Sequence, residues 1–83
     1  MPKIPRDISG RHLAFLLSAY GYKLERQTGS HMRLRSAFQE KEHKITIPDH
    51  EALKIGTLGN ILADSAQYLE ISKQALVDKL FER

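Results

Sequence analysis

Residues 31–35 read His-Met-Arg-Leu-Arg, and in this stretch apolar and polar side chains alternate strictly. Alternation with a period of two is typical of a β-strand that buries one face and exposes the other. The methionine and the leucine therefore point towards a core, while Arg33 and Arg35 point outward together with His31, which has the same parity. The stretch predicts a sheet with one solvated face that carries a histidine and two arginines.

Two other segments show the same period, at residues 22–25 and 44–47, so three short strands are expected. Residues 28–30, Thr-Gly-Ser, form a tight connection between the first two strands, and a polar stretch at 39–42 links the second to the third. Short connections make both pairings antiparallel. The side chains expected to face the core are Tyr22, Leu24, Met32, Leu34, Ile45 and Ile47, and those expected to face solvent are Lys23, Glu25, Gln27, Arg33, Arg35, Lys44 and Thr46.

Helices are predicted on both sides of these strands. Apolar residues at helical spacing follow the N-cap residue Ser9 and stop before Gly21, which predicts a helix over residues 10–20. A second helix is expected over residues 57–69, with its first residue, a threonine, as the cap, and a third begins after the N-cap Ser72. The order α-β-β-β-α-α predicts an α+β fold in which helices cover one face of a three-stranded antiparallel sheet.

The composition limits the chemistry that this fold can carry. The 83 residues include no cysteine, so disulfides, thiolate metal sites and thiol nucleophiles are excluded, and histidine is the main candidate for proton transfer. No apolar run approaches the roughly 20 residues of a membrane span, and the N-terminus lacks a signal-peptide pattern. We therefore expect one domain in a cytoplasmic protein that does not contact the membrane.

The positive charge is concentrated in the first part of the chain. The net charge is +3, but residues 1–50 carry +4 and all four histidines, whereas residues 51–83 carry −1. This asymmetry favours a polyanionic partner for the N-terminal part, although an ordinary solvated basic surface would have the same composition.

The residues expected around His31 suit acid–base chemistry on a phosphate. An imidazole titrates near neutral pH, and neighbouring cations such as Arg33, Arg35 and Lys44 can hold a phosphate and stabilise the charge that develops on it. The combination suits metal-independent RNA cleavage, in which a ribose 2′-hydroxyl attacks its own phosphodiester. On the pattern alone, an ordinary exposed histidine after a turn is the favoured interpretation of His31, because exposed histidines are common.

Histidine and lysine side chains of this chain could serve two other kinds of site. His31, His43 and His50 could form a three-histidine metal site, but their spacing matches no known metal motif. Lys54 lies just before a helix N-terminus, where free N–H groups could bind a phosphate, or where the segment could simply cap the helix.

Four motifs together resemble one known family. They are Arg-Gln-Thr-Gly-Ser-His at 26–31, Ile-Thr-Ile-Pro-Asp-His at 45–50, Leu-Lys-Ile-Gly-Thr-Leu at 53–58 and Pro-Arg-Asp-Ile-Ser-Gly at 5–10. In combination they are similar to the HicA (YcfA-like) toxins of prokaryotic type II toxin–antitoxin systems. The resemblance covers nearly the whole chain, which is accordingly interpreted as one HicA-like domain over residues 1–83.

The resemblance implies a fold like that of double-stranded-RNA-binding domains, α-β-β-β-α, with an additional C-terminal helix. It also implies an mRNA interferase that cleaves transcripts, that has His31 as its catalytic histidine, and that is neutralised by a HicB antitoxin. No metal or cofactor is expected. The residues then expected to bind RNA are Arg33, Arg35, Lys44, Lys23 and Lys54, and those expected to shape the turn are Gly29 and Ser30.

Some alternatives stay open at this point. The same basic face could belong to a non-catalytic RNA-binding module, or the chain could be an inactive relative that binds a protein through its acidic C-terminal segment. Residues 64–70 lengthen the segment between the last two helices compared with the family. Among aromatic residues, Phe38 is the one free candidate for base stacking, so weak sequence preference is expected.

Overall fold

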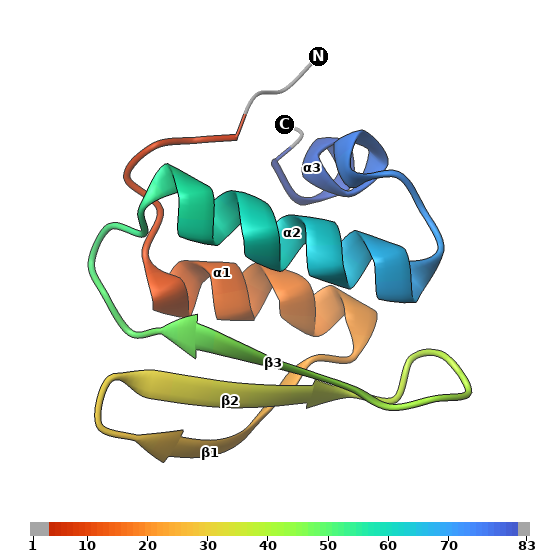
Figure 1. The fold of residues 1–83 in the computed structure, drawn as a ribbon, viewed down its shortest axis with the longest axis horizontal. Coiled ribbons are helices and arrows are strands. Elements are labelled where there is room, and N and C mark those ends of the chain that lie inside the picture. Colours follow the sequence, from red (N-terminus) through yellow and green to blue (C-terminus); the bar gives the residue numbers. More distant parts are fainter. Residues whose placement is uncertain (1–3, 82–83) are drawn as a thin grey trace.

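The computed structural model describes residues 4–81 and confirms the predicted α+β fold. A helix is followed by three antiparallel strands and two further helices, an arrangement consistent with the fold of double-stranded-RNA-binding domains (Figure 1). The elements are α1 (Gly10–Leu17), the 3-10 turn η1 (Ser18–Tyr20), β1 (Lys23–Thr28), β2 (His31–Ser36), β3 (His43–Pro48), α2 (Ile55–Leu69) and α3 (Lys73–Phe81).

The helices and the sheet form two layers. Figure 1 shows α1 and α2 on one side of the sheet and α3 against α2. The strand order is β1-β2-β3, so β2 is the central strand. Its side chains alternate between exposed and buried along its whole length. The buried cluster lies between the helices and one face of the sheet, so the opposite face of the sheet is open to solvent. Among the described helices, none is long and apolar enough to cross a membrane.

The ends of α1 and α3 follow from the predicted caps. The Ser9 hydroxyl accepts a hydrogen bond from the backbone N–H of His12 at 3.0 Å, and the Ser72 hydroxyl accepts one from Ala75 at 3.0 Å. The predicted first helix stays α-helical only to Leu17 and then tightens into η1, which ends at Gly21 with φ of 82°.

The predicted start of α2 is wrong by two residues. The helix begins at Ile55 with Lys54 as its N-cap, and no side chain caps it. Thr57 lies inside the first turn, so the predicted Thr57 cap does not exist. The preference of threonine for N-cap positions is a local tendency, and here the helix starts two residues earlier, at the exposed Ile55 and Gly56.

A β-bulge interrupts the pairing of β1 with β2. Leu24 pairs with Leu34, but the next pair is Arg26 with Arg33, so Glu25 is an extra residue in β1. Because cross-strand partners share a face, the residues after Glu25 lie on the faces opposite to those that simple alternation predicts.

The bulge and the edge position of β1 overturn two predictions, those for Gln27 and Leu24. Gln27 was expected to face solvent with the arginines, but it pairs with the buried Met32 and lies on the helical side. Arg26 takes a place on the open face instead. Leu24, expected in the core, is 57% exposed because β1 is an edge strand that the helices do not cover. The other core predictions are confirmed for Tyr22, Met32, Leu34, Ile45 and Ile47.

Close packing between α1 and the end of β3 gives the first testable prediction. A Cβ added at Gly10 would lie 1.9 Å from the carbonyl oxygen of Pro48, whereas one added at Gly56, also in a first helical turn, meets nothing within 4 Å. We expect Gly10→Ala to destabilise the protein by about 2 kcal/mol or more, and Gly56→Ala to stabilise it by up to about 1 kcal/mol. Urea unfolding of both variants measures the change in the free energy of unfolding. Equal effects of the two substitutions would contradict the close packing of Gly10 against Pro48.

Candidate functional site

His31 is the first residue of β2 and lies on the open face of the sheet. It is exposed, and its neighbours in the ladders are Thr28 on β1 and Pro48 on β3. Two residues further along β2, Arg33 lies between Arg26 and Thr46. An open hollow of about 330 Å³ is lined by Arg26, Thr28, His31, Arg33 and Thr46. The predicted neighbourhood of His31 and Arg33 is therefore present in the structure.

Arg26 is a site residue that the sequence reasoning missed. It faces Arg33 directly across the β1–β2 ladder, and within residues 4–81 neither guanidinium is paired with a carboxylate. Like charges directly opposite each other in a sheet are destabilising. The pair therefore forms a local excess of positive charge that an anion would relieve. The alternation of apolar and polar residues does not point to Arg26, because only the bulge brings it to this face.

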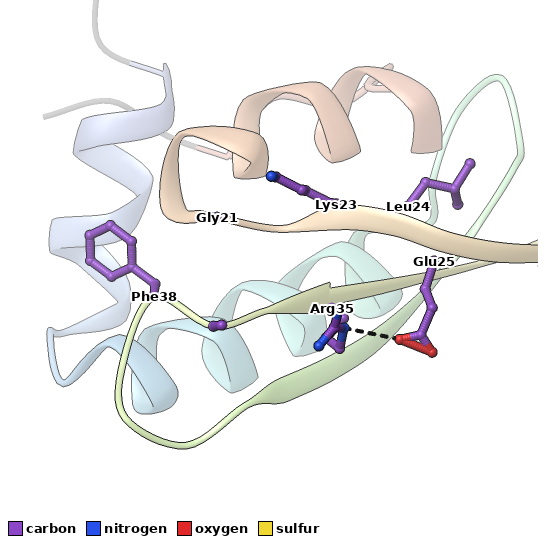
Figure 2. Close-up of a pocket in the computed structure, with 7 residues that line it drawn as sticks. Gly21, Lys23, Leu24, Glu25, Arg35 and Phe38 are labelled. Carbon is purple, nitrogen blue, oxygen red and sulfur yellow. Dashed lines mark ion pairs between the residues drawn. The ribbon is translucent and has the colours of Figure 1, made fainter.

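The cations at the other end of the open face are largely neutralised. Arg35 lies 3.2 Å from a Glu25 oxygen, as Figure 2 shows, and is also paired with Glu42. Lys44, the ladder partner of Arg35 on β3, lies 3.7 Å from Glu25. These carboxylates compete with any phosphate for both cations. The strongest uncompensated charge on this face is therefore next to His31.

The two remaining predicted cations are less closely associated with His31. Lys23 is exposed at the start of β1, where it pairs with Arg35 rather than with the residues around His31. Lys54 is the N-cap of α2 and belongs to the helical layer. The structure thus groups His31 with Arg33 in one hollow, and neither Lys23 nor Lys54 lines it.

The turn that carries His31 is held by the Gln27 side chain. Gly29 has a φ of 59°, a left-handed conformation that favours glycine, and it forms the two-residue turn with Ser30. The Gln27 amide donates hydrogen bonds of 3.1 Å both to the Gly29 carbonyl and to a carboxylate oxygen of Asp49. The Asp49 backbone N–H donates to the Ser30 carbonyl at 2.7 Å. The two residues before His31 are therefore fixed from the end of β3.

Asp49 also connects this turn to α1. The Arg11 guanidinium donates to both Asp49 carboxylate oxygens at 3.1 to 3.2 Å. The hydrogen bonds from Arg11, and then that from Gln27, hold the pKa of Asp49 below its ordinary value of 3.8. Asp49 was not predicted as a site residue, because its partners are distant in sequence and leave no local pattern.

His43 belongs to a different part of the molecule. Its Nδ1 is hydrogen-bonded to the Tyr22 hydroxyl at 2.6 Å, its Nε2 lies 3.3 Å from Asp64, and its ring stacks on Tyr68 with centroids 4.8 Å apart. Burial raises the pKa of the Tyr22 hydroxyl. These contacts give His43 a structural role.

The three-histidine arrangement considered above does not form. In the β2–β3 ladder, His31 pairs with Pro48 and His43 pairs with Ser36, so the two histidines lie at opposite ends of the sheet, about 16 Å apart at the spacing of a strand. Over the part of the chain that the structure describes, no three His, Asp or Glu side chains are grouped as metal ligands.

These features define a class of protein: a small α+β domain whose sheet offers an open face with a histidine at a rigid turn beside two unpaired arginines. A family model described as the HicA toxin of bacterial toxin–antitoxin systems matches residues 10–66, more than half of the chain. This chain belongs to the HicA toxin family. The match includes the whole sheet and ends before α3. No curated protein and no solved structure matches the chain.

The Asp49 network predicts a pH-dependent contribution to stability. Because the pKa of Asp49 is lower in the folded protein than its ordinary value, ionised Asp49 stabilises the fold above about pH 4, and this contribution is lost as the pH falls through the folded pKa. We expect Asp49→Asn to lower the free energy of unfolding at pH 7 and to have progressively less effect below pH 4. Unfolding curves at several pH values measure the difference.

Asp7→Asn is the matched control, because Asp7 is an exposed aspartate and its replacement changes the net charge of the protein by the same amount. A pH-independent effect of Asp49→Asn, or an equal effect of Asp7→Asn, would contradict the role assigned to the Asp49 carboxylate.

Proposed function

We propose that this toxin is an mRNA interferase, an endoribonuclease that cleaves RNA on the open face of its sheet, with His31 as the acid–base group. The observation that carries the proposal is the hollow in which His31 lies beside Arg26 and Arg33, two arginines unpaired within the described residues. Family membership supports it, since HicA toxins are known as RNase-like toxins.

The proposed reaction uses the nucleophile that RNA itself provides. The ribose 2′-oxygen forms a bond to the adjacent phosphorus, and the bond from phosphorus to the 5′-oxygen of the next nucleotide breaks. The products are a 2′,3′-cyclic phosphate and a 5′-hydroxyl. His31 takes the proton of the 2′-hydroxyl or gives a proton to the departing 5′-oxygen. Arg26 and Arg33 stabilise the negative charge on the phosphate oxygens.

The remaining predicted residues are proposed to bind RNA away from the cleavage point. Arg35 and Lys44 lie further along the open face, where competition from Glu25 weakens their hold on a phosphate. Lys23 and Lys54 are exposed and would contact the backbone at longer range. Gly29 and Ser30 are proposed to set the direction of His31 through the turn.

A toxin of this family implies an antitoxin partner. We propose that it is HicB-like and that it acts in the cytoplasm, where the proposed mRNA substrate is found. An antitoxin that covers the open face would block access to His31 and would find the same unpaired arginines available for its own carboxylates.

Removal of the His31 imidazole tests the catalytic role. We expect His31→Ala to reduce cleavage of a single-stranded RNA by at least about 100-fold, the lower end of what general acid–base catalysis contributes, while the fold stays intact. His12→Ala, which removes another exposed histidine from α1, should leave cleavage unchanged. A gel assay with 5′-labelled RNA, run with a chelator present, gives both rates.

Two results would reject this mechanism. Cleavage of an oligonucleotide that has 2′-deoxyribose at the cut position would rule out attack by the 2′-hydroxyl. Binding of RNA without any scission by the wild-type protein would favour the non-catalytic RNA-binding module.

The unpaired arginines give a separate prediction about RNA affinity. In the His31→Ala background, Arg26→Gln and Arg33→Gln should each weaken RNA binding and reduce the salt dependence of log K by about 0.7. Neither should lower stability, because each removes one side of a repulsive pair. Lys79→Gln, an exposed cation on α3, is the control. Fluorescence anisotropy titrations at several salt concentrations measure the slopes; an equal change for Lys79→Gln would contradict a specific site.

A further inference from the structure

A second hollow, of about 470 Å³, lies at the other end of the sheet from His31. It is formed between β1 and the segment that follows β2, and Figure 2 shows the side chains around it. Its lining residues are Gly21, Lys23, Leu24, Glu25, Arg35, Ala37 and Phe38. The site proposed for RNA cleavage uses none of these for its chemistry.

Phe38 presents an aromatic ring at the edge of this hollow. The side chain is 56% exposed, although a phenylalanine in a short loop would normally gain free energy by burial. The ring makes an edge-to-face contact with Tyr20, with centroids 5.7 Å apart. Much of the ring is therefore available to a ligand.

The backbone around Phe38 is held in place by buried hydrogen bonds. The Phe38 N–H donates to the Ser36 hydroxyl at 3.1 Å, and this hydroxyl donates to the Tyr20 carbonyl at 2.7 Å. Ser36 is completely buried. The next residue, Gln39, donates its backbone N–H to the Tyr68 hydroxyl at 2.9 Å. A ligand that stacks on Phe38 therefore meets a ring whose backbone is already ordered, which reduces the entropic cost of binding.

The polar groups of the hollow include both hydrogen-bond donors and acceptors. The Glu25 carboxylate accepts, and the Arg35 guanidinium, 3.2 Å from it, donates (Figure 2). Glu25 and Glu42 are both paired with Arg35, which leaves Lys23 as the one lining cation not paired with a carboxylate within residues 4–81, so the hollow holds a phosphate less well than the site beside His31. A mixed donor and acceptor edge next to an aromatic ring matches a nucleobase instead. Guanine fits best, since its N1–H and N2 amine can donate to a carboxylate and its O6 and N7 accept from an arginine.

We propose that this hollow binds one unpaired nucleobase of the RNA, stacked on Phe38, with guanine preferred over adenine. The inference rests on the proposed function, because it requires RNA on the open face. His31 and Arg35 are four residues apart on β2, which is about 13 Å at the spacing of a strand. A chain whose scissile phosphate lies beside His31 would therefore bring a nucleotide further along the strand to Phe38.

The experiment measures RNA binding separately from cleavage. In the His31→Ala background, the affinity for an A-rich oligonucleotide that contains a single guanine is measured by fluorescence anisotropy. Phe38→Leu should weaken binding at least fivefold, as expected when one base loses its stacking partner. Phe38→Tyr, which keeps the ring, should bind nearly as well as the parent. Phe15→Leu, at an exposed phenylalanine of α1, should have no effect.

Recognition of the base edge is tested with a second variant. Replacing the guanine by adenine should weaken binding to the parent protein, and Glu25→Gln should remove this difference. The same variant should raise affinity in general, because it frees Lys44 and leaves Arg35 with Glu42 as its remaining carboxylate partner. A guanine preference that survives Glu25→Gln would overturn the assignment of Glu25.

The possible failures are distinguishable. Unchanged affinity in Phe38→Leu, in a protein that binds and cleaves RNA, would overturn the nucleobase site and leave the proposed function intact. Absence of RNA binding and cleavage in the wild-type protein would overturn both. If Phe38→Leu fails to fold, binding of the guanine-containing RNA by Phe38→Tyr that is at least about fivefold weaker than binding by the parent would overturn stacking on this ring.

Discussion

The bulge at Glu25 determines which side chains surround His31. Without the extra residue, Gln27 would share the open face with His31 and Arg33, and Arg26 would turn towards the helices. With it, two arginines oppose each other on the open face, and Gln27 reaches the other side of the sheet. One irregularity in β1 thus creates the local positive charge and at the same time positions the amide that holds the Gly29 carbonyl.

The two ends of the sheet are anchored in different ways, and this difference suits the roles proposed for them. At the end with His31, the Asp49 carboxylate accepts hydrogen bonds from Arg11 of α1 and from Gln27 of β1. The Asp49 backbone N–H donates to Ser30 in the turn. At the far end, Tyr68 of α2 stacks on His43 and binds the backbone of the loop around Gln39. Both sites on the open face are therefore built on segments that are ordered before any ligand arrives.

The sequence predicts β2 and β3 well and β1 poorly, for one physical reason. Parity reports the face of a side chain only while the register is continuous, as it is from Met32 to Leu34 and from Ile45 to Ile47. A bulge leaves no mark in the alternation, so Arg26 could not be found. The Asp49 network was equally invisible, because Arg11 and Asp49 lie 38 residues apart and no periodicity or spacing connects them. His31 could be predicted because a turn of glycine and serine and the alternation after it both point to the same face.

The charge distribution on the open face differs between the proposed cleavage site and the proposed base-binding site. Near His31, Arg26 and Arg33 are uncompensated, which costs folding free energy but provides a strong field for a phosphate. At the far end, Glu25 neutralises Arg35 and Lys44, which suppresses phosphate binding there and leaves directional donors and acceptors. We therefore expect an RNA chain to be attracted most strongly beside His31, where the reacting phosphate must lie. The end of the sheet that carries Glu25 can then bind a base without competing for that phosphate. Since Glu25 is itself the bulged residue, the insertion that brings Arg26 opposite Arg33 also places the carboxylate that pairs with Arg35 and Lys44.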